Sequence, residues 1–242
     1  SIDDTGTFSR SVVAALQNGG FGMLTTLHLR LRARPESDTT MVTRGDRDRL
    51  TRAGRDAIQA GINAQALELC APAVVADPEW QLAARLSGPA IGVAAESTAL
   101  AAATALEWRA LTVEQGHAFW TMAARAPLGG SVTLRLGALP DGLDQTLDLL
   151  GEVLDEGLVT AGATTGQIRW SGDATAPLIR RVRTIAAARE MPLTLERAPW
   201  ALRRELGHFG AYREGVGPIV GRLRETFDPS GAFVVAMEGH DG

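Results

Sequence analysis

An acidic side chain and an imidazole are the first candidates for proton transfer in this sequence. Glu68 lies in the apolar run 66–69, where a carboxylate faces either a substrate pocket or, as is commoner for a strand glutamate, solvent. His117 shortly precedes Phe119 and Trp120, and it is either a base that reaches an acidic substrate or a surface histidine near a helix start. The residue types alone leave both alternatives open.

A second histidine and a group of arginines are candidates for binding an anion or a partner. His208 follows a helix that begins near Trp200, so it either contacts a pocket or lies at the helix C-terminus beside the helix dipole. Arg180, Arg181 and Arg183 could attract a carboxylate substrate or an acidic subunit. A run of this kind is more often the solvated face of an amphipathic helix.

Several kinds of chemistry are excluded by the residue types that are missing. All 24 basic residues are arginine, so Schiff-base formation and a Walker A phosphate loop have no lysine to use. Cys70 is the single cysteine, which excludes a disulfide within the chain and a Cys-x-x-Cys redox pair. No histidine pair has metal-ligand spacing, and Glu152 and Asp155 are interpreted as solvated helix charges, so we expect no metal site and name no catalytic base.

Composition and charge are those of a globular protein able to bury a full core. Of the 242 residues, 45% are hydrophobic and 21% are charged, and the formal net charge is −4. The negative balance argues against a nucleic-acid partner, which would need a basic face. No apolar run approaches the length of a membrane span, and the first residues do not resemble a signal peptide. We therefore expect a cytoplasmic protein without a transmembrane segment.

Strand and helix patterns alternate along the chain in two successive rounds. Each round reads strand, helix, strand, strand, helix, which predicts an α+β fold: an antiparallel sheet with helices on one face. Strands are expected at 23–32, 39–43, 64–69, 79–86, 131–136, 158–162, 166–170 and 193–197. Helices are expected at 9–17, 46–60, 90–106, 113–124, 142–154, 174–188 and 217–227, with a further one beginning near Trp200.

Three stretches of the sequence resemble one protein family in their order and spacing. The stretch 18–35, Asn-Gly-Gly-Phe-Gly to Pro35, resembles the end of the FAD-binding lobe in FAD-linked oxidases of the vanillyl-alcohol-oxidase type. The stretch 64–69 resembles the first strand of their substrate domain. The stretch 192–199, Gly210 and the run 222–231 resemble its C-terminal end. Within the family, the FAD-binding E subunits of bacterial glycolate oxidase are the most similar.

The resemblance implies a fold, a cofactor and a substrate class. It implies a remnant of an FAD-binding lobe at 1–36 and a ferredoxin-like, duplicated substrate or cap domain at 37–242. In such an enzyme FAD carries out the oxidation of a small 2-hydroxy acid, while this domain shapes the substrate pocket. The implied partners are the other subunits of a glycolate-oxidase-like complex, through which the protein would lie at the periphery of a membrane.

The glycine turn near the start of the chain is the implied contact with FAD. Gly19, Gly20, Phe21 and Gly22 would let the backbone approach the flavin closely, because glycine has no Cβ, and Thr25 would donate a hydrogen bond. The same residues are also typical of a helix C-cap followed by a turn into a strand. Both interpretations stay open at this point.

The sequence departs from the family pattern in two places. It contains nothing like the glycine-rich lobe that binds the FAD pyrophosphate, and an Ala-Phe-Val-Val-Ala run, 232–236, stands where the family has an Asn-Pro-Gly run. We therefore expect FAD in the complete subunit but not on this chain alone, the chain being a fragment of a longer subunit. The alternatives are a non-catalytic assembly subunit derived from such a domain, or an unrelated ferredoxin-like domain.

Overall fold

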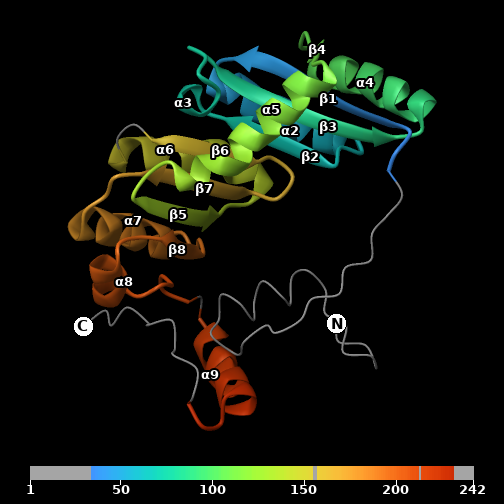
Figure 1. Ribbon diagram of the computed structural model, residues 1–242. Helices are drawn as coiled ribbons and strands as arrows, with labels where there is room; N and C mark the ends of the chain where they lie inside the picture. The colour runs from blue at the N-terminus through green and yellow to red at the C-terminus, as the bar shows by residue number, and fades with distance from the viewer. Residues whose placement is uncertain (1–33, 155–156, 213, 232–242) are drawn as a thin grey trace.

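A single antiparallel sheet organises the computed structural model, which describes residues 34–154, 157–212 and 214–231 (Figure 1). Within these residues the sheet has eight strands in the order β4-β1-β3-β2-β6-β7-β5-β8. Every neighbouring pair of strands is antiparallel. The protein is therefore α+β, as the alternation of patterns predicted.

The sheet is built from two copies of the same βαββαβ unit. Their elements are β1 (Ser37–Gly45), α2 (Arg47–Gln59), β2 (Ala66–Cys70), β3 (Trp80–Gly88), α4 (Ala90–Thr104) and β4 (Arg109–Ala110) in the first repeat, and β5 (Val132–Gly137), α6 (Leu143–Val153), β6 (Leu158–Gly162), β7 (Gln167–Gly172), α7 (Ala176–Ala188) and β8 (Leu193–Arg197) in the second. Each repeat has the ferredoxin-like order in which its first and third strands are central. The predicted duplication is confirmed.

Apolar side chains on one face of the sheet form the main core. Strand alternation places Leu82, Leu134 and Ile168 on this face, where they are fully buried against the repeat helices. Leu50 of α2 and Ile179 of α7 are likewise buried, because α2 and α7 each turn an apolar stripe toward the sheet. This face carries α2, α4, α6 and α7.

One helix covers the opposite face of the first repeat. Figure 1 shows α5 (Val113–Arg125) crossing the strands on the side away from α2. Phe119 is buried there with Val42, and the Trp120 Nε1 donates to Thr40 Oγ1 over 2.8 Å. A Cβ on Gly116 would lie 2.9 Å from that same oxygen, so glycine allows α5 to approach β1. The sequence predicted this helix, but the expectation that the helices share one face of the sheet is wrong for α5, which packs on the other face through Phe119 and Trp120.

The remaining elements connect the repeats or follow them. They are α3 (Pro72–Val75), the 3-10 turns η1 (Ala126–Leu128) and η2 (Pro140–Gly142), α8 (Trp200–Leu206) and α9 (Val216–Phe227). The short elements α3, β4, η1 and η2 were not predicted. In the described part of the chain, no helix is long and apolar enough to cross a bilayer.

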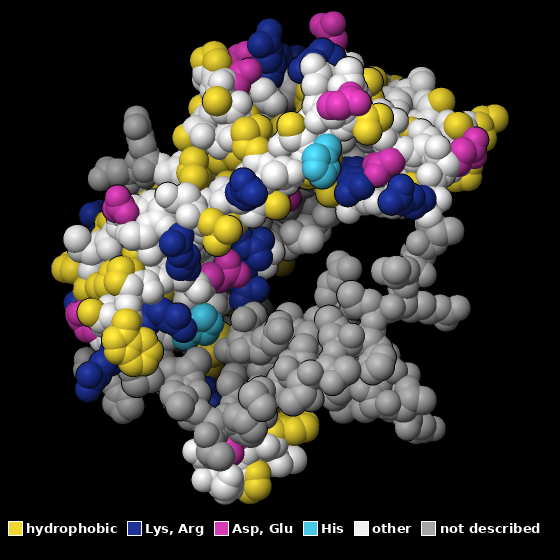
Figure 2. Space-filling model, in the orientation of Figure 1, with side chains coloured by type: hydrophobic (Ala, Val, Ile, Leu, Met, Phe, Trp, Pro, Cys, Tyr) yellow, Lys and Arg dark blue, Asp and Glu magenta, His cyan; other side chains and the backbone are white. Residues whose placement is uncertain are grey.

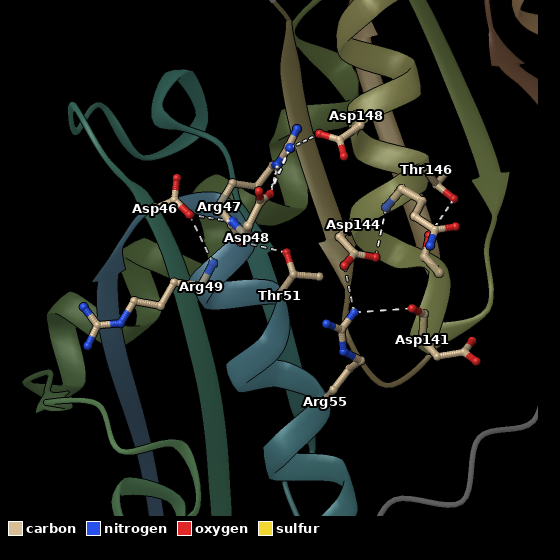
Figure 3. A network of polar contacts seen from close by, with 12 residues as sticks. Asp46, Arg47, Asp48, Arg49, Thr51, Arg55, Asp141, Asp144, Thr146 and Asp148 are labelled. Atoms are coloured by element: carbon tan, nitrogen blue, oxygen red, sulfur yellow. Dashed lines mark hydrogen bonds and ion pairs between the residues drawn. The ribbon is translucent and has the colours of Figure 1, made fainter.

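The two repeats meet at a short strand pairing and at a polar contact between helices. Strands β2 and β6 pair over three residue pairs centred on Leu69 and Ala161. Figure 3 shows the helix contact, where Arg55 Nη1 lies 3.1 Å from Asp144 Oδ2 and Arg47 pairs with Asp148 of α6. Because β2 and β6 are edge strands of their own repeats, this pairing merges two sheets into one.

The expected boundary between residues 36 and 37 stays a prediction. The helix at 9–17, the strand at 23–32 and the glycine turn with Gly19, Gly20, Phe21, Gly22 and Thr25 lie outside the described residues.

Candidate functional site

The second repeat presents a charged row on the sheet face opposite α6 and α7. Antiparallel register places Thr160 of β6 opposite Arg169 of β7, Arg169 opposite Arg135 of β5, and Arg135 opposite Thr194 of β8. Paired residues point to the same side of a sheet, so these four side chains share one face. Figure 2 shows basic side chains around an acidic one on this face, which we call the polar face.

Glu196 holds both arginines of the polar face. Arg169 Nε donates to Glu196 Oε2 over 3.0 Å, and Arg135 Nε lies 3.0 Å from Glu196 Oε1. A third contact runs from Arg135 Nη2 to Thr194 Oγ1 over 3.2 Å. Each guanidinium is thereby fixed in position while its side chain stays partly open to solvent. Charge-assisted hydrogen bonds of this kind are stronger than neutral ones, and they also fix the orientation of the guanidinium groups.

Glu68 adds to the same face a carboxyl whose pKa is raised. Burial raises the pKa of Glu68 to about 7, although the charge of Arg169 and a hydrogen bond from Thr160 both favour the ionised form. Gly162 of β6 lies directly across from Glu68, and a Cβ there would make only an ordinary contact of 3.5 Å with Glu68 Oε2. Glu68 is half-buried, so it is not the solvent-exposed strand glutamate that one interpretation expected, and near neutral pH its carboxyl is partly protonated.

The charges of the polar face leave room for one anion. With Glu68 protonated, Arg135, Arg169 and Glu196 sum to one net positive charge, and with Glu68 ionised the sum is zero. A singly charged carboxylate therefore fits best when Glu68 is neutral. The FAD pyrophosphate carries two negative charges, which exceed the single net positive charge of this face.

His208 lies beside the polar face, along the edge strand β8. Its backbone oxygen accepts from the Leu195 N–H over 2.7 Å, and Thr194 and Phe209 form an isolated bridge. Burial lowers the pKa of His208, and the charges of Arg203 and Arg135 lower it further. We therefore take the ring to be neutral at pH 7. Its Nδ1 is buried without a hydrogen-bond partner among the described residues.

The three clustered arginines do not form one site. Arg183 is buried and donates to the carbonyls of Leu206 and, over 3.0 Å, Gly207, at the C-terminus of α8. Arg180 pairs with Glu205 of α8, and Arg181 is exposed on α7. Arg183 therefore stabilises the end of the helix, the position that one interpretation of the sequence gave to His208. The idea of a common anion site at these arginines is wrong, because their side chains have different partners.

The other sequence candidates lie away from the polar face. His117 is exposed on α5, and Glu152 is exposed on α6. Asp155 lies outside the described residues. Cys70 is fully buried, and burial together with the nearby charge of Glu68 raises the pKa of its thiol, so it is no nucleophile. No group of three or more metal-binding side chains occurs in the part of the chain that the structure describes.

Sequence reasoning missed Arg135, Arg169 and Glu196. Each lies within a strand that was predicted. Arg135 and Arg169 stand between apolar neighbours and Glu196 follows Leu195, so the alternation indicated that these side chains point away from the core. Their convergence depends on the strand order β7-β5-β8, which brings together residues up to 61 positions apart, from Arg135 to Glu196. The local pattern does not contain that order.

Comparison with known proteins gives a fold likeness and no family. No protein-family model matches the sequence, and no curated protein matches it. Among solved structures, the chain is similar to one of alkyldihydroxyacetonephosphate synthase, at a TM-score of 0.47 and 9% identity over 82% of this chain. The chain spans 44% of the length of that protein. A likeness of this strength carries no conclusion about activity.

Proposed function

We propose that this chain is the substrate or cap region of an FAD-dependent oxidoreductase that acts on a small 2-hydroxy acid. FAD would be bound elsewhere in the complete subunit and would accept the hydride, whereas this chain binds and orients the substrate. The complete protein would work in the cytoplasm with other subunits of a glycolate-oxidase-like complex, which would bring it to the membrane periphery. The resemblance of the sequence to that family is the reason for naming this class.

The single structural observation that supports the proposal is the charge balance of the polar face. Arg169 and Arg135, held by Glu196, present guanidinium groups suited to a carboxylate. The Thr160 hydroxyl and the Glu68 carboxyl lie next to them and offer hydrogen bonds to the neighbouring hydroxyl of the substrate. A 2-hydroxy acid carries these two groups on adjacent carbons, so both can be bound at once.

A non-catalytic assembly role is the second candidate, and one surface favours it. Helix α9 has no buried residue, and Ile219, Leu223 and Phe227 are 50%, 41% and 47% exposed along one side of it. An apolar stripe on an exposed helix is typical of a surface that contacts another chain. The two candidates differ in whether the polar face binds a hydroxy acid.

Calorimetric titration of the purified chain with glycolate tests the proposal. We expect saturable binding that is at least tenfold weaker for Arg169→Gln, because that change removes a charge that faces the carboxylate. Arg181→Gln is the matched control, since it removes the same charge from the exposed side of α7 and should bind as the wild type does. Binding should weaken from pH 6 to pH 8, as Glu68 loses its proton.

Two results would contradict the proposal. If the wild-type chain binds neither glycolate nor lactate at pH 6, the polar face is not a hydroxy-acid site and the assembly role is favoured. If Arg169→Gln and Arg181→Gln weaken binding equally, the attraction is a general effect of charge and the polar face has no special part in it.

A further inference from the structure

A cleft of about 460 Å³ lies at the junction of the two repeats, apart from the polar face. One wall comes from the first repeat, at α3 and the start of β3, and the other from the second repeat, at the C-terminal half of α6. The lining is mainly apolar and includes Trp80, Leu150, Gly151 and Trp170, with Arg47 as the only charged member of this lining. Its volume is in the range of sites that bind small organic molecules.

Two indole rings, one from each repeat, line the cleft in different ways: Trp80 is half-buried and accessible from the cleft, whereas Trp170 is 2% exposed and belongs to its floor. Trp170 is held in place by two glycines, since a Cβ on Gly157 would lie 2.3 Å from its Nε1 and a Cβ on Gly172 would lie 2.5 Å from its Cζ2. Trp80, at the start of β3, contributes the second indole. Indole rings favour offset stacking or edge contacts with other flat rings.

The only charge in the lining is already compensated. Arg47 Nη2 lies 2.9 Å from Asp48 Oδ1 and also pairs with Asp148, as Figure 3 shows. A bound anion would meet these two carboxylates, and a bound cation would meet the guanidinium, so an uncharged ligand fits best. Arg47 Nη1 makes no hydrogen bond to any described residue, and it remains able to donate one.

Helix α6 leaves the cleft open at Gly151. A Cβ added there would meet no atom within 4 Å, so the backbone does not require glycine for steric reasons. Glycine inside a helix costs about 0.5–1 kcal/mol relative to alanine. A larger side chain at this position would extend into the space between α6 and α3, which makes it a direct way to fill the cleft.

We propose that this cleft between the repeats binds a flat, uncharged aromatic molecule that carries a hydrogen-bond acceptor for Arg47. The ligand ring would lie against Trp80, above the floor to which Trp170 belongs. Because the walls of the cleft come from both repeats, the ligand would contact each repeat. This site is independent of the hydroxy-acid site on the polar face.

A pair of coumarin dyes tests the proposal on the whole chain. The neutral dye is 7-diethylamino-4-methylcoumarin, a flat molecule whose lactone carbonyl accepts hydrogen bonds, and the anionic one is 7-diethylaminocoumarin-3-carboxylate. Excitation of tryptophan and detection of coumarin emission report binding close to the indoles. We expect saturable 1:1 binding of the neutral dye and at least tenfold weaker binding of the anion. Equal binding of the two dyes would overturn the inferred ligand chemistry.

Substitutions at two helical glycines show where the neutral dye binds. Gly151→Leu should weaken its binding at least tenfold, whereas Gly221→Leu in α9, also a position with no atom within 4 Å of a Cβ, should leave it unchanged. Thermal unfolding of both variants checks that they are folded, and Gly151→Ala, with a smaller side chain, should weaken binding less than Gly151→Leu. Unsaturable binding by the wild type, or wild-type affinity in folded Gly151→Leu, would overturn the proposal.

Discussion

Replacing Glu68 by glutamine should change how stability depends on pH. The pKa of Glu68 is raised from 4.5 to about 7 in the folded chain, so the folded state binds the proton more tightly than the unfolded state. Its contribution to stability is therefore fully present below pH 4.5 and is lost as the pH rises through about 7. A pKa difference of this size corresponds to about 3 kcal/mol, of which about 2.5 kcal/mol falls between pH 5 and 8. Partial exposure reduces the expected effect to about 2 kcal/mol.

Urea denaturation at pH 5, 6, 7 and 8 measures this effect. The wild type and Glu68→Gln have all other titrating groups in common. The difference between their unfolding free energies therefore reports the contribution of the Glu68 carboxyl. We expect Glu68→Gln to gain about 2 kcal/mol relative to the wild type between pH 5 and 8. Stability curves that stay parallel over this range would show that Glu68 titrates normally, and the charge argument for the polar face would then fail.

Three further predictions concern residues that do not belong to the polar face. Cys70 is fully buried, so a thiol reagent such as dithionitrobenzoate should react with it only after unfolding, and rapid reaction of the folded chain would contradict its burial. Gly130→Ala should destabilise the fold by at least about 2 kcal/mol in urea denaturation, because the new Cβ would lie 2.4 Å from the Gly172 backbone, whereas Gly151→Ala should be neutral or stabilising. Asp46→Ala should cost about 1 kcal/mol, because Asp46 accepts from the backbone of Asp48 and Arg49 at the start of α2, and Asp46→Asn should restore most of this loss.

Most of the regular elements were predictable because each has a local signal. The alternation in 79–86 and the apolar stripe in 174–188 are properties of the sequence itself, and β3 and α7 agree with them closely. The two rounds of elements then suggested the duplicated fold. Short elements such as β4 and α3 were missed, because two or four residues are too few to show a period.

The arrangement of the functional side chains was much less predictable. Glu68 was recognised as a candidate, but its raised pKa comes from burial that only the packed structure provides. The placement of Arg183 beneath α8 could not be inferred, because its neighbours Arg180 and Arg181 suggested a solvated face. Contacts between distant segments decide both outcomes.

The most direct test of the central claim is an NMR titration of the isotope-labelled chain with glycolate at pH 6. We predict that glycolate changes the backbone amide chemical shifts most in β6, β7 and β8, around Thr160, Arg169 and Glu196. In Arg169→Gln these chemical-shift changes should be absent. Shift changes elsewhere in the chain, or none at saturating glycolate, would contradict the assignment of the polar face as a hydroxy-acid site.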